Sequence, residues 1–173
     1  WGLLMDMKTL VIPYAPPDVL GFPAAHAKYL GLPYFVLSGC SDSKILDGQA
    51  TLEAALTLMG DVLSGANLIH DLGYLESGLQ GSLELLVICD EIIGWIKRFM
   101  DGIEVDAESL ALNVIDEVGA EGHFMSSEHT LQNFRRDWYP NLLDRQKHKA
   151  WVASGSTSLR DRDKARVEAI INI

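Results

Sequence analysis

The sequence predicts an α/β fold in which short parallel strands alternate with helices, followed by further helices. Three runs, residues 9–14, 34–38 and 66–70, are apolar and rich in β-branched or aromatic residues, as is typical of strands buried on both faces. Stretches with helical spacing of apolar residues separate them, which favours parallel βαβ units with right-handed crossovers. Because closing a barrel needs about eight strands, the pattern fits the C-terminal part of a larger β/α (TIM-type) barrel, or a small doubly wound sheet.

The first predicted strand and helix are short. Residues 9–14 end at a proline-rich turn, and residues 24–30 predict a helix that Gly31 ends and Pro33 stops. Residues 34–38 predict the second strand, which ends before a glycine.

The next helices are longer. Residues 47–63 predict a helix that Asp47 caps at its start and that Gly65 follows at its end. After the third strand, residues 82–100 predict another helix, with two basic residues in its last turn, where they favour the helix dipole.

The rest of the chain predicts only helices. Their expected ranges are residues 106–118, 128–138, 142–151 and 156–171. Ser158 and Asp161 have the spacing of a capping box at the start of the last of these helices. We expect a single region over residues 1–173, with strands and helices over about 5–120 and a helical C-terminal segment over about 123–173.

Composition limits the classes of function. The chain has 173 residues, enough for one domain with a core, and its formal charge of −10 argues against nucleic acid as a partner. Residues 1–134 hold 5 basic and 19 acidic side chains, a net charge of −14, whereas residues 135–173 hold 9 and 5, a net charge of +4. The acidic part suits a cationic small ligand or simply solubility, and the basic end suits docking on an acidic surface.

The sequence predicts a cytoplasmic protein that does not contact a membrane. The most apolar stretch, residues 83–100, contains five charged side chains, which a membrane span would not tolerate. The start of the chain lacks the basic region of a signal peptide, and Cys40 and Cys89 are expected to be reduced, buried thiols. Because the chain begins with Trp1, we expect it to be a piece of a longer protein.

Polar and ionisable residues gather where the predicted strands end. In parallel β/α folds the carboxyl ends of the strands form the reactive face. The segments concerned are residues 15–18, 39–49 and 70–78. This contrast between apolar strands and polar loops is the strongest positional indication of a functional site.

Each candidate residue also has a plain structural interpretation. Asp42, Lys44 and Asp47 could form an internal ion-pair network, and His70 could satisfy a backbone partner rather than bind a ligand. Cys40, His70 and Cys89 suggest a zinc site, but Cys89 is predicted to lie inside a helix far from any strand end, so we expect no metal.

Several sequence blocks resemble the trimethylamine methyltransferase family. They follow the family's order from about Met5 onward and match its C-terminal part. The blocks are Ser41-Asp-Ser-Lys-x-x-Asp-x-Gln-Ala50, Gly65-Ala-Asn-Leu-Ile-His-Asp-x-Gly-Tyr-Leu-Glu-Ser-Gly78, Asp90-Glu-Ile-Ile-Gly94, Gly102-Ile-Glu-Val-Asp106, Ile115-x-x-Val-Gly119, Gly122-His-Phe124, His129-Thr130 and Trp138-Tyr-Pro140. The chain departs from the family at residues 16–26, a segment several residues shorter than the family's helix there.

The resemblance implies a β/α barrel and a methyl transfer from a methylated amine to the cobalt of a separate corrinoid (cobalamin) protein. No tightly bound cofactor is implied. The trimethylamine-specific branch carries a pyrrolysine, which this sequence does not show, and the other branch acts on quaternary amines such as glycine betaine. Open sheet edges lead us to expect an oligomer.

On this basis we expect a site at the ends of the strands. The expected catalytic residues are Asp42, Lys44 and Glu76, and the expected substrate-binding residues are Asp47, Gln49, His70 and Tyr74. Acidic groups and an aromatic face suit a quaternary ammonium ion, which has no proton to donate. Two alternatives are a non-catalytic structural or interaction fragment and a zinc-dependent barrel methyltransferase.

Overall fold

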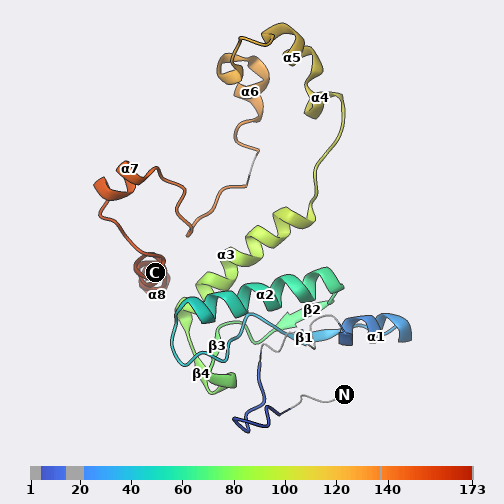
Figure 1. The fold of residues 1–173 in the computed structure, drawn as a ribbon, viewed down its shortest axis with the longest axis vertical. Helices are drawn as coiled ribbons and strands as arrows, with labels where there is room; N and C mark the ends of the chain where they lie inside the picture. The colour runs from blue at the N-terminus through green and yellow to red at the C-terminus, as the bar shows by residue number, and fades with distance from the viewer. Residues whose placement is uncertain (1–4, 15–21, 137, 173) are drawn as a thin grey trace.

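The computed structural model describes residues 5–14, 22–136 and 138–172 and shows a mixed α/β fold that is mostly helical (Figure 1). Strands β1 (Phe35–Leu37) and β2 (Leu68–His70) pair in parallel, with Phe35 opposite Leu68 and Leu37 opposite His70. Helix α2 (Gly48–Ser64) connects them, which confirms the predicted βαβ unit. The described residues contain these two parallel strands and no closed barrel.

Helix α2 has both predicted ends. Asp47 Oδ1 accepts a hydrogen bond from the amide of Ala50 at 3.0 Å, and Gly65 ends the helix with a φ of +84°. A positive φ is easily reached only by glycine, so the chain can turn there into β2 without strain.

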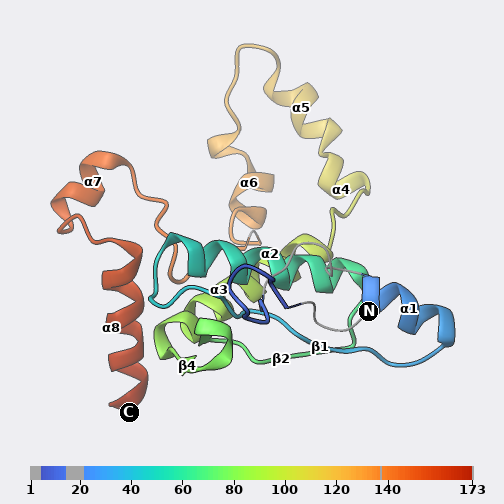
Figure 2. The same cartoon turned by 60° about the horizontal axis from the view of Figure 1, so that its bottom comes forward.

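The core lies between α2 and α3 (Leu83–Met100), and the small parallel sheet lies below α2 in Figure 2. Its fully buried side chains include Ala54, Leu58, Leu85 and Cys89. Ser82 caps the start of α3 by accepting a hydrogen bond from the amide of Leu85 at 3.1 Å. The helix itself begins at Leu83, one residue after its predicted start at residue 82.

The predicted first strand, residues 9–14, is wrong. Asp6 instead organises a turn, because its main chain bonds to Leu10 and Val11 and its carboxylate accepts from the Lys8 amide at 2.8 Å and the Thr9 hydroxyl at 3.0 Å. The helix predicted at residues 24–30 is α1 (Phe22–Leu30). The predicted proline-rich turn at 15–18 and most of the shortened segment 16–26 lie outside the described residues.

A small antiparallel hairpin was not predicted. Strands β3 (Tyr74–Leu75) and β4 (Gln80–Gly81) flank a single 3₁₀ turn, η2 (Glu76–Gly78). Strands of two residues are too short to leave an alternating apolar pattern in the sequence.

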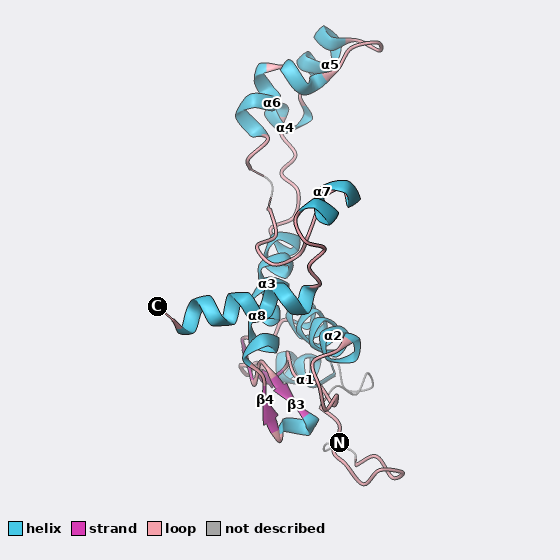
Figure 3. Cartoon of the chain, turned by 90° about the vertical axis from the view of Figure 1, so that its left-hand side faces the viewer, coloured by secondary structure: helices cyan, strands magenta, loops and turns pink. Residues whose placement is uncertain are grey.

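The later helices are shorter than predicted. The helix expected over residues 106–118 is split into α4 (Ala107–Leu110) and α5 (Leu112–Val118), because Ala111 takes a left-handed conformation with a φ of +47°. After the turn η3 (Phe124–Ser126), α6 (Glu128–Asn133) ends before the predicted Trp138. We call residues 103–134 the arm; it projects away from α3 (Figures 1 and 3).

After the arm, residues 138–147 run back beside α3, and we call them the returning segment. We call the rest of the described chain, outside the arm, the body. Residues 142–147 are not helical, contrary to prediction, because the amides of Asn141 and Leu143 donate to the buried carboxylate of Glu91 instead of to a helix. Only α7 (His148–Ala153) forms there, and α8 (Leu159–Ile171) follows with the predicted capping box and packs against α3. Within the described ranges, no helix combines the length and apolar character that a membrane span requires.

Candidate functional site

Two loops meet at the carboxyl ends of β1 and β2. Residues 38–47 connect β1 to α2, and residues 70–78 run from the end of β2 into the β3–β4 hairpin. Four main-chain hydrogen bonds join them: Ser38 N to His70 O at 3.0 Å, Gly73 N to Gly39 O at 2.8 Å, Ser41 N to Tyr74 O at 2.9 Å, and Glu76 N to Ser43 O at 2.9 Å. The predicted convergence of these two loops is therefore confirmed.

Asp42 holds three chain segments together. Its Oδ1 accepts from the amide of Tyr14 at 2.8 Å and from the hydroxyl of Ser77 at 3.0 Å. The side chain is half-buried, and its other carboxylate oxygen has no hydrogen bond within the described residues. Asp42 thus anchors the loops and still places negative charge at their surface.

Tyr14 packs closely over the second loop. A Cβ on Gly78 would lie 2.5 Å from the Tyr14 hydroxyl oxygen, and Gly78 has a φ of +84°. Only glycine satisfies both conditions. Burial, with a smaller contribution from the negative charge of Asp71, raises the pKa of Tyr14, so the phenol stays protonated at neutral pH.

His70 pairs with the residue that follows it. Its Nδ1 lies 2.9 Å from Asp71 Oδ1, and its ring stacks on Phe35 with centroids 4.0 Å apart. The plain structural interpretation, a backbone partner for the imidazole, is replaced by this carboxylate contact. About a third of each side chain in the pair is exposed, at 34% and 35%.

The 70–78 loop contains backbone strain. Asp71, Glu76 and Ser77 have φ values of +66°, +50° and +52°, in the left-handed region that non-glycine residues rarely adopt. Such conformations cost on the order of 1–3 kcal/mol each and often occur at functional sites. Glu76 is half-buried, and its carboxylate accepts a hydrogen bond from the side-chain amide Nε2 of Gln80 at 3.0 Å. The Tyr74 side chain is exposed.

The remaining predicted residues bond to the first loop or to α2. Lys44 Nζ donates to the main-chain oxygen of Asp42 at 2.9 Å, and Gln49 donates to Glu53 at 2.9 Å. Asp47 caps α2 and accepts from Ser43, and the Ala50 amide bond lowers its pKa. The predicted ion-pair network of Asp42, Lys44 and Asp47 is wrong. The ion pairs among the described residues are His70–Asp71 and Arg136–Glu108. A catalytic role for Lys44 and substrate contacts by Asp47 and Gln49 remain predictions.

Sequence reasoning missed the residues of α2 that hold the first loop. Glu53 Oε2 accepts from the Ser41 hydroxyl at 2.6 Å and from the Asp42 amide at 2.9 Å. Thr57 Oγ1 accepts from the Gly39 amide at 3.1 Å, and Asp61 accepts from the Ser38 hydroxyl. We call Glu53, Thr57 and Asp61 the polar stripe. Their spacing of four residues places them on one face of the helix, a signal that the sequence did contain.

The polar stripe is largely out of water. Thr57 and Asp61 are 2% and 3% exposed. Burial raises the pKa of Asp61, and its hydrogen bond to Ser38 opposes that rise. The paired groups satisfy one another, as buried polar groups in folded proteins do.

No cluster of three or more histidine, cysteine or acidic residues suited to a metal occurs within the described residues. Both thiols are fully buried, and burial raises the pKa of Cys40 and of Cys89 to about 12. The expectation that Cys89 lies far from the strand ends is wrong, because its Sγ lies 3.3 Å from the Gly39 oxygen just after β1. Protonated thiols are poor zinc ligands.

Comparisons with known proteins agree with the resemblance seen in the sequence blocks. The family model described as trimethylamine methyltransferase (MTTB) matches residues 19–173. A trimethylamine methyltransferase of Desulfitobacterium hafniense is 37% identical over 92% of the chain, and one of Methanosarcina thermophila is 39% identical over 89%. A glycine betaine methyltransferase of Desulfitobacterium hafniense is 34% identical over 97%. These matches cover 33%, 32% and 36% of the relatives, so the chain spans about a third of their length. The chain belongs to the trimethylamine methyltransferase family.

Proposed function

We propose that this chain forms part of a methyltransferase that moves a methyl group from a methylated amine to the cobalt of a separate corrinoid protein. In this proposal β1 and β2 are two neighbouring strands of a TIM-type barrel. The observation that supports it best is the joining of two acidic loops at the carboxyl ends of parallel strands, in a chain that belongs to this family.

In the proposed reaction, the protein's own side chains do not need to supply the nucleophile. When bound, the reduced cobalt of the corrinoid supplies the nucleophile, and the bonding pair of the broken C–N bond leaves with the amine. The protein must hold the cation with one methyl group toward the acceptor and exclude water. A set of carboxylates and aromatic faces can do this without a metal or a nucleophile of its own.

The joined loops offer such groups. We assign Asp42 and Glu76 to attraction of the cationic nitrogen, and Tyr74 and Tyr14 to contact with the methyl groups. The Tyr14 amide donates to Asp42, and the amide of Ser41, next to Asp42, donates to the main-chain oxygen of Tyr74, so these three residues belong to one joined region. The His70–Asp71 pair lies at the start of the second loop. Lys44 and Asp47 make hydrogen bonds within the first loop, and Gln49 bonds to Glu53, which holds that loop.

A fusion protein tests the proposal. The chain replaces the matching third of the Desulfitobacterium hafniense glycine betaine methyltransferase, and methylation of a reduced corrinoid protein is followed by its absorbance, with glycine betaine or trimethylamine as donor. We expect methylation that depends on the donor. Asp42→Asn in the fusion should lower the rate at least about tenfold, which corresponds to about 1.4 kcal/mol.

Asp90→Asn is the matched control, because Asp90 is an exposed carboxylate on α3, outside the two loops. A folded fusion that transfers no methyl group would favour the non-catalytic alternative. Activity that is lost with a chelator and restored by zinc would favour the zinc-dependent alternative.

A further inference from the structure

The arm has no core of its own. None of its residues is buried, and many of its large apolar side chains are exposed: Ile103, Val105, Leu110, Leu112, Ile115, Phe124, Met125, Leu131 and Phe134. So many exposed large apolar side chains on one segment point to a site of interaction. The arm therefore has the surface of a segment that packs against something else.

The arm is also strongly acidic. Residues 103–134 contain seven aspartate and glutamate side chains and no lysine or arginine. Asp116 and Glu117, on α5, are exposed. The surface that covers the arm must supply both apolar contacts and positive charge.

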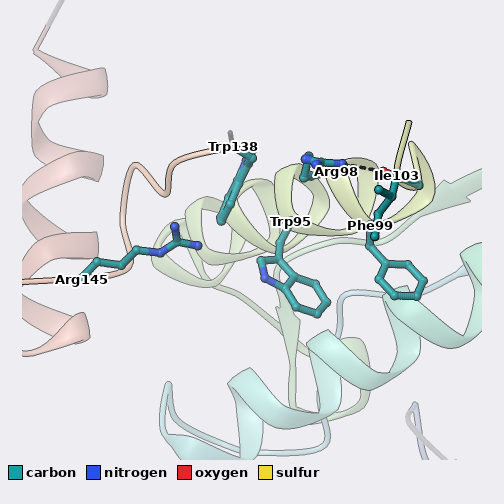
Figure 4. A pocket seen from close by; sticks show the side chains of 7 residues that line it. Trp95, Arg98, Phe99, Ile103, Trp138 and Arg145 are labelled. Carbon is teal, nitrogen blue, oxygen red and sulfur yellow. Dashed lines mark hydrogen bonds between the residues drawn. The ribbon is translucent and has the colours of Figure 1, made fainter. Parts of the chain in front are cut away.

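The body of the same chain carries a surface with those two properties. A groove of about 720 Å³ lies between the end of α3 and the returning segment, and Figure 4 shows its side chains. We call it the aromatic–arginine groove; its lining includes Trp95, Phe99, Trp138, Arg98 and Arg145. Both of its charged lining side chains are basic, and residues 135–173 as a whole carry a net charge of +4.

The groove is held in a fixed shape. Glu91, which is 6% exposed, accepts amide hydrogen bonds from Asn141 at 3.1 Å and Leu143 at 3.2 Å, so it fastens the returning segment to α3. The Arg145 guanidinium lies 5.5 Å from the ring centre of Trp138. A preformed groove loses little conformational entropy when a partner binds.

The arm points away from the groove on its own chain. Its first residue, Ile103, lines the groove, but the arm then leads away from α3 (Figures 1 and 3). The tip of the arm therefore reaches a groove most directly on another molecule.

We propose that two copies of this chain exchange arms, with the acidic, apolar arm of each copy seated on the aromatic–arginine groove of the other. The contact is isologous, since each copy gives the same arm and offers the same groove. Charge complementarity identifies a second copy as the occupant. This inference does not depend on the proposed methyl transfer.

A charge-swap experiment tests the exchange. One variant carries Asp116→Lys and Glu117→Lys in the arm, and the other carries Arg98→Glu and Arg145→Glu in the groove. Sedimentation equilibrium in about 50 mM salt should give twice the chain mass for the unmodified protein, and each variant alone should dissociate at least about tenfold more readily. An equimolar mixture should recover the double mass, because both arm–groove contacts in the mixed pair then join opposite charges.

The control variant, Asp90→Lys with Glu168→Lys, reverses two exposed carboxylates outside the arm and should dimerise as the unmodified protein does. Raising the salt to about 500 mM should weaken the unmodified dimer, which tests the idea without any substitution. A monomer at 100 µM, a dimer unchanged by either swap, or a mixture that stays monomeric would each overturn the proposal. Hydrogen exchange that shows a protected arm in a monomer would identify another occupant and overturn it as well.

Discussion

Asp163 is a buried carboxyl group without a partner. It is fully buried on α8, and neither of its oxygens makes a hydrogen bond within the described residues. Burial raises its pKa, as does the nearby charge of Glu84, although the charges of Arg160 and Arg162 oppose the rise. The ionised carboxylate of Asp163 therefore destabilises the folded protein.

The pH dependence of stability should reveal this group. When the pKa of a carboxyl group is higher in the folded protein than in the unfolded chain, ionisation of the group lowers the free energy of unfolding. This loss is absent below the pKa in the unfolded chain, near 3.8, and grows as the pH rises through the pKa in the folded protein. Asp163→Ala should therefore raise the free energy of unfolding at pH 7 by about 1–3 kcal/mol, and by much less at pH 4. Urea denaturation at both pH values measures it, with Asp90→Ala as the control at an exposed site. An equal effect at the two pH values would contradict this account.

Gly78 shows how one position constrains the candidate site. A Cβ there would meet Tyr14, and the positive φ adds backbone strain. Gly78→Ala should lower the free energy of unfolding by about 1–3 kcal/mol and displace Tyr14. Thermal denaturation and tyrosine fluorescence measure both effects. Gly81→Ala is the control, because nothing lies within 4 Å of its Cβ position. If the two variants behave alike, the close packing of Tyr14 does not constrain the loop.

At the scale of elements, α2 sets the geometry of the first loop. Its buried apolar residues, Ala50, Ala54 and Leu58, belong to the core that α2 shares with α3. Glu53, Thr57 and Asp61 bond to successive parts of the loop after β1. The loop thus takes its shape from side chains of the helix that follows it. The position of Asp42 depends on this arrangement, because Glu53 accepts its amide hydrogen.

Removing one hydrogen bond of the polar stripe should show how much it contributes to the free energy of unfolding. Thr57→Val keeps the shape of the side chain but leaves the buried amide of Gly39 without its acceptor. We expect a loss of about 1–3 kcal/mol in unfolding free energy, measured by urea denaturation. Thr51→Val, at a half-buried threonine in the first turn of α2, is the matched control and should cost less. Equal losses would show that the contact to Gly39 adds nothing particular.

The sequence allowed prediction where local signals act alone. Asp47, Gly65 and Ser158 fix helix ends through short-range hydrogen bonds or a backbone conformation, and all three were predicted. Prediction failed where distant residues decide. Glu91, 50 positions away from Asn141, keeps residues 141–143 out of a helix, and the turn at Asp6 replaces a strand that has no partner among the described residues. The two loops of the site were predicted from the ends of the strands, but the contacts that position Asp42 arise only in three dimensions.

At the scale of the whole molecule, the chain divides into a packed body and an arm without buried residues. The body joins α2, α3 and α8 around one core, and the returning segment ties its C-terminal helices to α3. The proposed exchange would cover surface that the body leaves exposed. A protease that cuts after glutamate should show this division.

We expect such a protease to cut first in the arm, at Glu104, Glu117 or Glu121, when salt holds the chain as a monomer. Glu53 and Glu91 should resist, because both are bonded within the body. Mass spectrometry of the early fragments identifies the sites, and low salt should slow the arm cuts several-fold if arms are exchanged. Early cleavage at Glu91 would mean that the body is not the stable unit.

The polar stripe also limits how this sequence can vary in length. Each residue of an α-helix turns the chain by about 100°, so one residue inserted or deleted between Thr57 and Asp61 would rotate one part of the stripe away from the other. Ser38 would then lose its carboxylate partner while Gly39 kept its hydroxyl partner. Substitutions along α2 can be absorbed one at a time, but a single-residue change in its length cannot. Length variation in this unit is therefore expected in the arm, which has no such register to keep.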